Sequence, residues 1–525
     1  MPKVLIADEL SPAAVRVFAE RGVEAEVRTG LKKDELVSVI GGYDGLAVRS
    51  ATKVTAEVLE AAPRLKVVGR AGIGVDNIDV EAATARGVVV MNTPFGNSVT
   101  TAEHAVALML ALCRQLPSAD RSTRAGKWEK SRFMGVELTG KTLGLIGCGN
   151  IGSIVADRAH GLKMRVIAFD PFLAPARARD LNVEKVELDE LLARADVITL
   201  HTPLTDQTRN ILSRGNLERT KPGVRIVNAA RGGLIDEHAL HDLIVSGHVA
   251  GAALDVFAVE PARESPLFGL EQVIVTPHLG ASTSEAQENV ALQVAEQISD
   301  YLTTGAVVNA LNMPSVTAEE APRLRPYMRL AEQLGAFAGQ LTETGLKGVT
   351  LTYSGLAASL NTKPVTQVAL AALLRPQLTT VNMVNAVAIA RSRNIDVAVT
   401  TRDQVEGYQT LVTVEVATER GPREVSGTLF QDHEPRLVSV RGIPMEARLG
   451  ARMLYVRNQD KPGFIGALGR ALGDAGINIA TFHLGRERAG GDAICLVEVD
   501  QEVPAGVLDA VAELPQVLQV RQLAF

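Results

Sequence analysis

The sequence predicts an α/β protein with two doubly wound parallel-sheet lobes, then an α+β segment, then a small domain of order βαββαβ. Short β-branched runs alternate with helical patterns over the first 310 residues, which is typical of parallel sheets covered on both faces. The alternation begins again near residue 140, which indicates a second lobe. After about residue 316 the pattern changes to one of alternating strands, which indicates an α+β domain.

Composition and charge exclude several classes of protein. The 525 residues suffice for three or four domains, and 46% hydrophobic residues provide for packed cores. The net charge of −6 gives no general attraction for nucleic acid or an anionic membrane. Cys113, Cys148 and Cys495 lack metal-ligand spacing, so we expect a reducing compartment and no metal site. "MPKVLIADEL" lacks the features of a signal peptide and the apolar stretch 105–112 is too short to cross a bilayer, so we expect a soluble cytoplasmic protein.

The first lobe starts at the N-terminus. Its strand candidates are "KVLIAD", "GLAVRS", "LKVVGRA" and "GVVVMN". A helix is predicted from about Val99 to Leu116, and because it is apolar nearly all round we expect it to be buried or to lie at an interface. A second long helix, from about Ala286 to Leu302, precedes a turn-rich linker, "NALNMPSV". We assign residues 1–98 and 285–316 to this lobe.

The second lobe is assigned to residues 99–284. Its strand candidates are "KTLGLIGCG", "MRVIAFD", "DVITLHTP", "VRIVNAA", "GAALDV" and "VIVTPH". Residues 317–450 then supply "KGVTLTYSG", "QTLVTVEVAT", "REVSGTLF" and "PRLVSVRGI" as strands of an α+β domain. Residues 451–525 are predicted to run strand, helix, strand, strand, helix, strand, which is the ferredoxin-like arrangement.

A dinucleotide site is predicted where the second lobe begins. Gly147, Gly149 and Gly152 have G-x-G-x-x-G spacing, follow a strand and open a helix. They permit a tight turn, close approach of a diphosphate, and helix–strand packing, in that order. Asp170 ends the next strand, suits the ribose hydroxyls and would repel a 2′-phosphate, so NAD is favoured over NADP. The alternative is a glycine-rich turn that binds nothing.

Three consecutive strands bring candidate proton-transfer groups to one edge of the sheet. Arg231 follows "VRIVNAA", Asp255 and Glu260 follow "GAALDV", and His278 follows "VIVTPH". A carboxylate beside an imidazole fixes its tautomer and stabilises its protonated form, so His278 can take a proton from an alcohol. The alternative is an ion-paired structural trio.

Three motifs, "NAARGGLIDE", "GAALDVFAVEP" and "TPHLGAST", resemble the signatures of the D-isomer-specific 2-hydroxyacid dehydrogenases. The resemblance implies that His278 is the acid/base, that Glu260 tunes it, and that Arg231 anchors the substrate's carboxylate. It also implies an NAD site, whose residues are Gly147, Gly149, Asn150, Ile151, Gly152, Asp170, Thr202, Ala229, Arg231, Asp255, His278, Gly280 and Ala281.

Within that family the whole chain is similar to the long members that act on D-3-phosphoglycerate in the first step of L-serine biosynthesis. This implies oxidation to 3-phosphohydroxypyruvate, with substrate contacts from Arg49, Ser50, Arg70, Gly72, Asn97 and Arg231. Three arginines suit a ligand with about three negative charges.

One cation of some relatives is missing from this substrate site, because Ala51 stands in its place. Lys130 or Arg132 can replace it, from the same chain or from a partner subunit; the alternative is that each is an ordinary exposed basic side chain. His104, in "TTAEH", is expected to have no role.

The C-terminal half resembles two regulatory domains. "NQDKPGFIGALG" and "GINI" are similar to ACT domains, which implies an L-serine site at Asn458, Asp460 and Asn478 and assembly into a homotetramer. The alternative is an ACT domain that only assembles the oligomer. Residues 317–450 resemble an intervening domain that binds anions or substrate, and their basic residues Arg436, Arg441 and Arg448 are otherwise a solvated face.

Three other functions compete with this interpretation. A glyoxylate, hydroxypyruvate or other 2-hydroxyacid reductase shares the two lobes, but such relatives usually lack the C-terminal 200 residues. An NAD-sensing corepressor would need a partner-binding groove or tail. An amino-acid sensor built on the ACT domain would leave the Arg, Glu and His set unexplained. Side activity on 2-oxoglutarate stays open.

Overall fold

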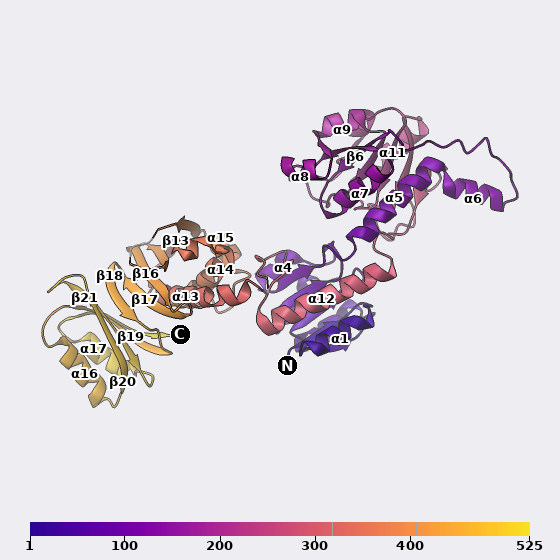
Figure 1. The fold of residues 1–525 in the computed structure, drawn as a ribbon. Coiled ribbons are helices and arrows are strands. Elements are labelled where there is room, and N and C mark those ends of the chain that lie inside the picture. Colours follow the sequence, from indigo (N-terminus) through magenta and orange to yellow (C-terminus); the bar gives the residue numbers. More distant parts are fainter. Residues whose placement is uncertain (318, 405–406) are drawn as a thin grey trace.

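The computed structural model describes residues 1–317, 319–404 and 407–525, and these residues form four sheets (Figure 1). The first is a five-stranded parallel sheet of order β2-β1-β3-β4-β5. Its strands are β1 (Lys3–Ile6), β2 (Glu24–Val27), β3 (Gly45–Val48), β4 (Val67–Arg70) and β5 (Val89–Asn92). Its helices are α1 (Pro12–Glu20), α2 (Lys33–Val39), η1 (Ile40–Gly42), α3 (Ala56–Glu60), α4 (Val80–Ala85) and α12 (Ser284–Thr304).

Helix α12 returns to this first lobe from the far end of the second one. It packs across β4 so closely that a Cβ atom on Gly69 would lie 2.6 Å from the side chains of Val294 and Ile298. The glycine therefore permits the contact that returns the chain to the lobe where it began.

The second lobe is a seven-stranded parallel sheet of order β12-β11-β10-β9-β6-β7-β8. Its strands are β6 (Thr142–Ile146), β7 (Arg165–Phe169), β8 (Glu184–Lys185), β9 (Val197–Leu200), β10 (Val224–Asn228), β11 (Val249–Leu254) and β12 (Val273–Val275). Its helices are α5 (Ser98–Arg114), α6 (Leu116–Arg124), α7 (Asn150–Gly161), α8 (Pro175–Asp180), α9 (Leu188–Arg194), α10 (Arg214–Glu218) and α11 (Glu237–Val245). The strand order reverses around β6, and ligands bind at such points in open α/β sheets.

Helix α5 is buried on one side only within the chain. One face, which includes Ala105 and Met109, is buried, whereas Val99 and Leu110 on the other side are 50% and 37% exposed. Of the two expectations, burial and a place at an interface, burial within the chain holds for one face, and the interface stays a prediction for the other.

Residues after 320 form a six-stranded mixed sheet of order β14-β13-β15-β16-β17-β18. Its strands are β13 (Leu346–Gly355), β14 (Asp396–Arg402), β15 (Thr410–Thr418), β16 (Gly421–Phe430), β17 (Glu434–Val440) and β18 (Ile443–Ala447). Its helices are α13 (Ala321–Gln340), η2 (Leu356–Ser359), α14 (Thr362–Leu374) and α15 (Ala386–Ser392). Strand β14 was not among the predicted strands, because its side chains are exposed on both faces and give no buried alternation.

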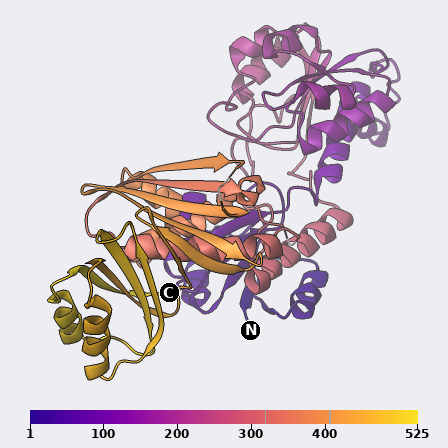
Figure 2. The same ribbon diagram turned by 60° about the vertical axis from the view of Figure 1, so that its left-hand side comes forward.

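The last sheet has four antiparallel strands of order β20-β21-β19-β22. Its elements are β19 (Arg452–Gln459), α16 (Phe464–Asp474), β20 (Ile479–Arg486), β21 (Asp492–Val499), α17 (Ala505–Ala512) and β22 (Val517–Ala524). Helices α16 and α17 cover one face, and the other face shares a hydrophobic core with the six-stranded sheet and α13 (Figure 2). The predicted βαββαβ order and the α/β fold class are confirmed. No helix in the described part of the chain is long and apolar enough to cross a membrane.

Candidate active site

The glycine-rich turn between β6 and α7 has the geometry that a dinucleotide requires. Gly147 has φ +94°, and a Cβ there would lie 2.6 Å from the His201 carbonyl oxygen. A Cβ on Gly152 would lie 2.3 Å from the Gly147 carbonyl oxygen, so helix α7 approaches the turn closely. Gly149 has nothing within 4 Å of its Cβ position, which leaves room beside the free N–H groups of α7. A diphosphate fits this turn.

Asp170 is fixed beside the same turn. One carboxylate oxygen accepts from the Cys148 N–H at 2.8 Å and the other accepts from the Phe172 N–H at 2.8 Å. Each oxygen keeps a further lone pair, so the carboxylate is oriented and still able to accept from ribose hydroxyls. The other predicted cofactor residues follow neighbouring strand ends or begin α7, and are Asn150, Ile151, Thr202, Ala229, Gly280 and Ala281.

His278 and Glu260 form a hydrogen-bonded pair. The Nδ1 atom of His278 lies 2.7 Å from Oε2 of Glu260, and the other oxygen of Glu260 accepts from the Phe257 N–H at 3.0 Å. Burial raises the pKa of Glu260, but the hydrogen bonds from His278 and Phe257 outweigh burial and hold the pKa below its usual value. An ionised Glu260 favours a proton on Nδ1 and leaves Nε2 of His278 for a substrate.

The backbone of His278 is also unusual. Its φ is +55°, a left-handed conformation that is uncommon for residues other than glycine, although asparagine, aspartate and histidine adopt it more often than most. Half of the side chain is exposed. Such conformations persist where the surrounding structure enforces them, often at functional sites.

A buried carboxylate holds the loop after β12 in this conformation. Asp255 is 0% exposed and accepts from the N–H groups of Leu279 and Gly280 at 2.7 and 2.8 Å and from the Thr276 hydroxyl at 2.6 Å. The Nε2 atom of His104, on α5, lies 3.2 Å from the same carboxylate. Burial raises the pKa of Asp255, but the hydrogen bonds from His104, Thr276 and Leu279 outweigh it and hold the pKa below its usual value.

Sequence reasoning missed this contact of His104, for which no role was expected. Thr101, one turn earlier on α5, donates to the Gly280 carbonyl at 2.8 Å. The two side chains share a helix face because they are three residues apart. This spacing was the one feature of the sequence from which their common role could have been predicted. Helix α5 therefore braces the loop that carries the candidate acid/base.

Arg231 reaches across to the first lobe. Its Nε donates to Asp76 at 3.2 Å and its Nη1 donates to the Ala230 carbonyl at 2.7 Å. A Cβ on Gly74 would lie 1.7 Å from its Nη2. The predicted trio is thus held in two parts, with His278 paired to Glu260 and Arg231 placed against the first lobe.

Arg70, at the end of β4, is half-buried, and Asn97, just before α5, is buried. Burial, followed by the nearby charge of Arg231, lowers the pKa of Arg70 to about 10. Nε of Arg70 and Oδ1 of Asn97 are buried and have no hydrogen-bond partner within residues 1–317, 319–404 and 407–525. An unpaired buried polar atom costs about 1–3 kcal/mol, so both atoms fit a site that a polar ligand completes.

The remaining predicted substrate residues have fewer contacts within the chain. Arg49 is half-buried, and its Nη1 donates to the Glu9 carbonyl at 3.4 Å. Ser50 is exposed. Gly72 lies against Arg70, because a Cβ there would be 2.0 Å from Nη1 of that arginine.

The two candidates for the missing cation lie on the surface of the second lobe. Lys130 is exposed. Arg132 donates through Nη2 to both oxygens of Glu271 at 2.8 Å and through Nη1 to Glu129 at 3.1 Å. Arg132 is therefore occupied by two carboxylates within its own chain.

The predicted effector residues are not brought together within one chain. Asp460 pairs with Arg486 at 3.0 Å, at the end of β20, whereas Asn478 precedes the start of that strand and donates to Asp500 at 2.6 Å. The two ends of an eight-residue strand are roughly 24 Å apart. Asn458 is 1% exposed and its Oδ1 has no partner, so it keeps an acceptor for a ligand.

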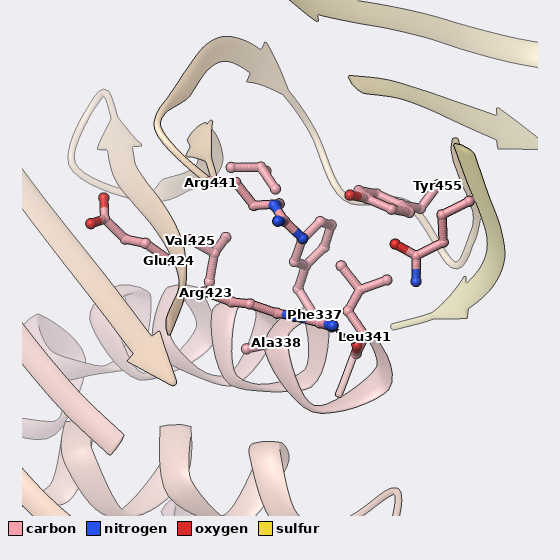
Figure 3. Close-up of a pocket in the computed structure, with 10 residues that line it drawn as sticks. Phe337, Ala338, Leu341, Arg423, Glu424, Val425, Arg441 and Tyr455 are labelled. Atoms are coloured by element: carbon pink, nitrogen blue, oxygen red, sulfur yellow. Dashed lines mark hydrogen bonds between the residues drawn. The ribbon is translucent and has the colours of Figure 1, made fainter. Parts of the chain in front are cut away.

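A pocket opens between the six-stranded and the four-stranded sheets (Figure 3). Arg441 lines it, together with Arg423 and an apolar part of α13. The other two arginines of the predicted basic group lie on a different carboxylate, because Arg436 is 2.7 Å and Arg448 is 3.9 Å from Glu434. The structure thus separates Arg441 from Arg436 and Arg448.

Three family models match the chain in succession. Residues 106–280 match the NAD-binding domain of D-isomer specific 2-hydroxyacid dehydrogenases, residues 323–441 match the D-3-phosphoglycerate dehydrogenase intervening domain, and residues 452–516 match the ACT domain. These matches confirm the predicted resemblance and the NAD cofactor.

Similar proteins extend the match to the whole chain. A D-3-phosphoglycerate dehydrogenase of Archaeoglobus fulgidus is 42% identical over 98% of this chain and 98% of its own. That of Bacillus subtilis is 39% identical over 99% of both. The chain belongs to the D-3-phosphoglycerate dehydrogenase family of D-isomer-specific 2-hydroxyacid dehydrogenases.

Solved structures match the two lobes. The TT0316 protein of Thermus thermophilus has a TM-score of 0.55 and 37% identity, and it covers 59% of this chain and 99% of its own. A glyoxylate reductase of Paecilomyes thermophila has a TM-score of 0.55 and 31% identity over 59% of this chain and 98% of its own. These proteins therefore share the two lobes and leave the C-terminal part of this chain unmatched.

Proposed function

We propose that the protein oxidises D-3-phosphoglycerate to 3-phosphohydroxypyruvate with NAD, in the cytoplasm, as the first step of L-serine biosynthesis. The observation that carries this proposal is the His278–Glu260 pair, 2.7 Å apart, in a chain that matches D-3-phosphoglycerate dehydrogenases from end to end. The proposed division of labour follows from the domains, with residues 1–98 and 285–316 binding substrate and residues 99–284 binding NAD.

Proton transfer is assigned to His278. When bound, NAD accepts the hydride from the carbinol carbon of the substrate. Nε2 of His278 takes the hydroxyl proton, and Glu260 stabilises the resulting imidazolium through Nδ1. Asp255 holds the neighbouring backbone N–H groups, so the imidazole keeps its place while its charge changes.

The substrate's charges are assigned to the first lobe and to Arg231. A planar guanidinium can fork onto a carboxylate, and Arg231 stands at the carboxyl end of β10 facing loop 72–76. Arg70 and Arg49, which are both half-buried, add two cations for the phosphate. Lys130 of a partner subunit is proposed to supply the cation that Ala51 lacks, because Arg132 is already paired.

The C-terminal domains are proposed to regulate this activity. L-serine is proposed to bind at Asn458, Asp460 and Asn478 from two ACT domains, in a homotetramer. The separation of Asp460 from Asn478 within one chain supports a site shared between subunits. Residues 317–450 are proposed as the intervening domain and residues 451–525 as the ACT domain, with no nucleic acid, metal or membrane partner.

A substrate panel tests the proposal. NADH oxidation by the purified chain is measured with 3-phosphohydroxypyruvate, glyoxylate and 2-oxoglutarate, each with and without L-serine. We expect a strong preference for the phosphorylated acid and a lower rate with L-serine. Activity on glyoxylate alone would favour the reductase, the second candidate, whose two lobes this chain shares.

A variant pair tests the role of His278. His278→Ala is expected to lower turnover by roughly 10²–10⁴, the usual contribution of a general base. His241 is the matched control, since it also pairs with a carboxylate, Asp242 at 3.1 Å, but stands on α11. His241→Ala should leave turnover unchanged, and equal losses in both variants would remove His278 from the mechanism.

A further inference from the structure

Strand β14 is an open edge of the six-stranded sheet. Among the residues that the structure describes, it pairs on one side only, in parallel with β13, from Gly348 opposite Asp396 to Ser354 opposite Arg402. Six of its seven side chains are exposed, and the central one, Val399, is 47% exposed. The strand therefore presents unpaired backbone groups and uncovered side chains together.

The strand lacks several of the features by which exposed edges usually avoid pairing, and its two charged residues, Asp396 and Arg402, stand at its ends. Its sequence, "DVAVTTR", has no proline and no lysine, and its register with β13 runs without a bulge. The opposite edge strand of the sheet is β18, which is covered. A Cβ on Gly485 of β20 would lie 2.6 Å from the Pro444 carbonyl oxygen of β18. Of the two edges, β14 is the one left for a partner.

The sequence of β14 is complementary to itself in the antiparallel direction. When two copies are aligned about Val399, Asp396 stands opposite Arg402 of the partner subunit, and Val399 stands opposite the partner's Val399. Within one strand Asp396 and Arg402 are about 20 Å apart, so they cannot pair with each other. Opposite charges directly across two strands stabilise pairing, and like charges there oppose it.

We propose that two copies of this chain associate through antiparallel pairing of their β14 strands, about a two-fold axis at Val399. Each contact away from the axis then occurs twice, as in any two-fold symmetric interface. The two six-stranded sheets become one continuous sheet across the subunits. This association is independent of the catalytic assignments, since β14 belongs to neither lobe.

Cross-linking tests the register directly. Val399→Cys places two thiols across the axis, where opposed residues have Cα atoms about 4.5–5.5 Å apart, a separation that a disulfide spans. Thr401→Cys is the matched control on the same face, since its two copies would lie roughly 14 Å apart. The native residues Cys113, Cys148 and Cys495 are buried and do not compete.

After mild oxidation, Val399→Cys is expected to run mainly as a covalent dimer on a non-reducing gel, and Thr401→Cys as a single chain. Cross-linking of both variants to the same extent would overturn the proposed register. Failure of Val399→Cys to cross-link would overturn the pairing itself.

A charge exchange provides a second test on the unmodified assembly. Asp396→Arg and Arg402→Asp each bring like charges together twice, so each is expected to weaken association at least tenfold in sedimentation or native mass spectrometry. The double variant restores opposite charges and should return within about threefold of the wild type. The proposal would be overturned by any of three results: a double variant that associates as weakly as the single variants, a wild type that does not associate, or single variants that associate like the wild type. Turnover should stay unchanged in all of these variants.

Discussion

Replacing Glu260 by glutamine removes the negative charge beside His278 and leaves an oxygen that can still accept the hydrogen bond. In Glu260→Gln the imidazole keeps its position, but the protonated ring loses its counter-charge. We therefore expect a lower kcat and a nearly unchanged KM, because the charge acts only once His278 has taken the proton.

The size of this effect follows from the geometry of the pair. A hydrogen bond to a charged group contributes about 1.5–3 kcal/mol, against about 0.5–1.5 kcal/mol between neutral groups, so the charge itself contributes about 1–1.5 kcal/mol. The side chains of His278 and Glu260 are 50% and 35% exposed, and solvent screening keeps the loss within this range. That energy corresponds to roughly a tenfold loss of kcat.

The assay is NADH formation from D-3-phosphoglycerate and NAD at several pH values, the direction in which His278 takes up the proton. Because the pKa of Glu260 is held below its usual value, Glu260 of the wild type stays ionised at pH 5 and above, and it is protonated only as the pH falls through that lowered pKa. Glu260→Gln should therefore be slower throughout this range. In a His278→Ala background the same substitution should cost almost nothing, since the pair acts as a unit. A full tenfold loss in that background would refute the coupling between the two side chains.

Five further substitutions, at four positions, test the cofactor turn and the support of the loop that carries His278. His104→Leu removes a donor to buried Asp255 and should lower kcat about tenfold, with little change in the dissociation constant for NADH. His104→Gln keeps a donor and should recover most of the rate. Equal rates in the two variants would contradict this role of His104. Asp170→Ala should weaken the binding of NAD and raise the relative use of NADP, measured as the ratio of kcat/KM for the two cofactors. An unchanged ratio would show that Asp170 does not contact the ribose. Gly149→Ala should weaken the binding of NAD at an unchanged Tm, because its Cβ meets only open space. Gly152→Ala should weaken the binding of NAD and also lower the Tm, because its Cβ would lie 2.3 Å from a carbonyl oxygen. Titration with NAD measures the first effect and calorimetry the second.

The class of fold and the cofactor turn could be predicted because both depend on residues that are close together in the sequence. Gly147, Gly149 and Gly152 lie within one turn, and the demand for backbone freedom at each is visible in the residue type itself. Parallel strand order places Arg231, Glu260 and His278 at one edge for the same reason, since residues after consecutive strands share that edge.

Contacts between distant segments could not be predicted. His104 and Asp255 are 151 positions apart, and their pairing depends on how α5 crosses the sheet. Strand β14 was missed because an exposed edge leaves no pattern of burial. The predicted effector set was read as one cluster, yet Asp460 and Asn478 lie toward opposite ends of β20.

The sequence by itself determined the α/β class, the NAD turn and the residue types available for proton transfer, because each of these depends on neighbours within a few residues. Only the tertiary structure decided that Arg231 turns toward Asp76 of the first lobe. It also decided that Asp255, fully buried, holds the loop behind the imidazole. The reason is physical: hydrogen bonds and burial between segments far apart in the chain depend on how the lobes pack, which no local pattern records.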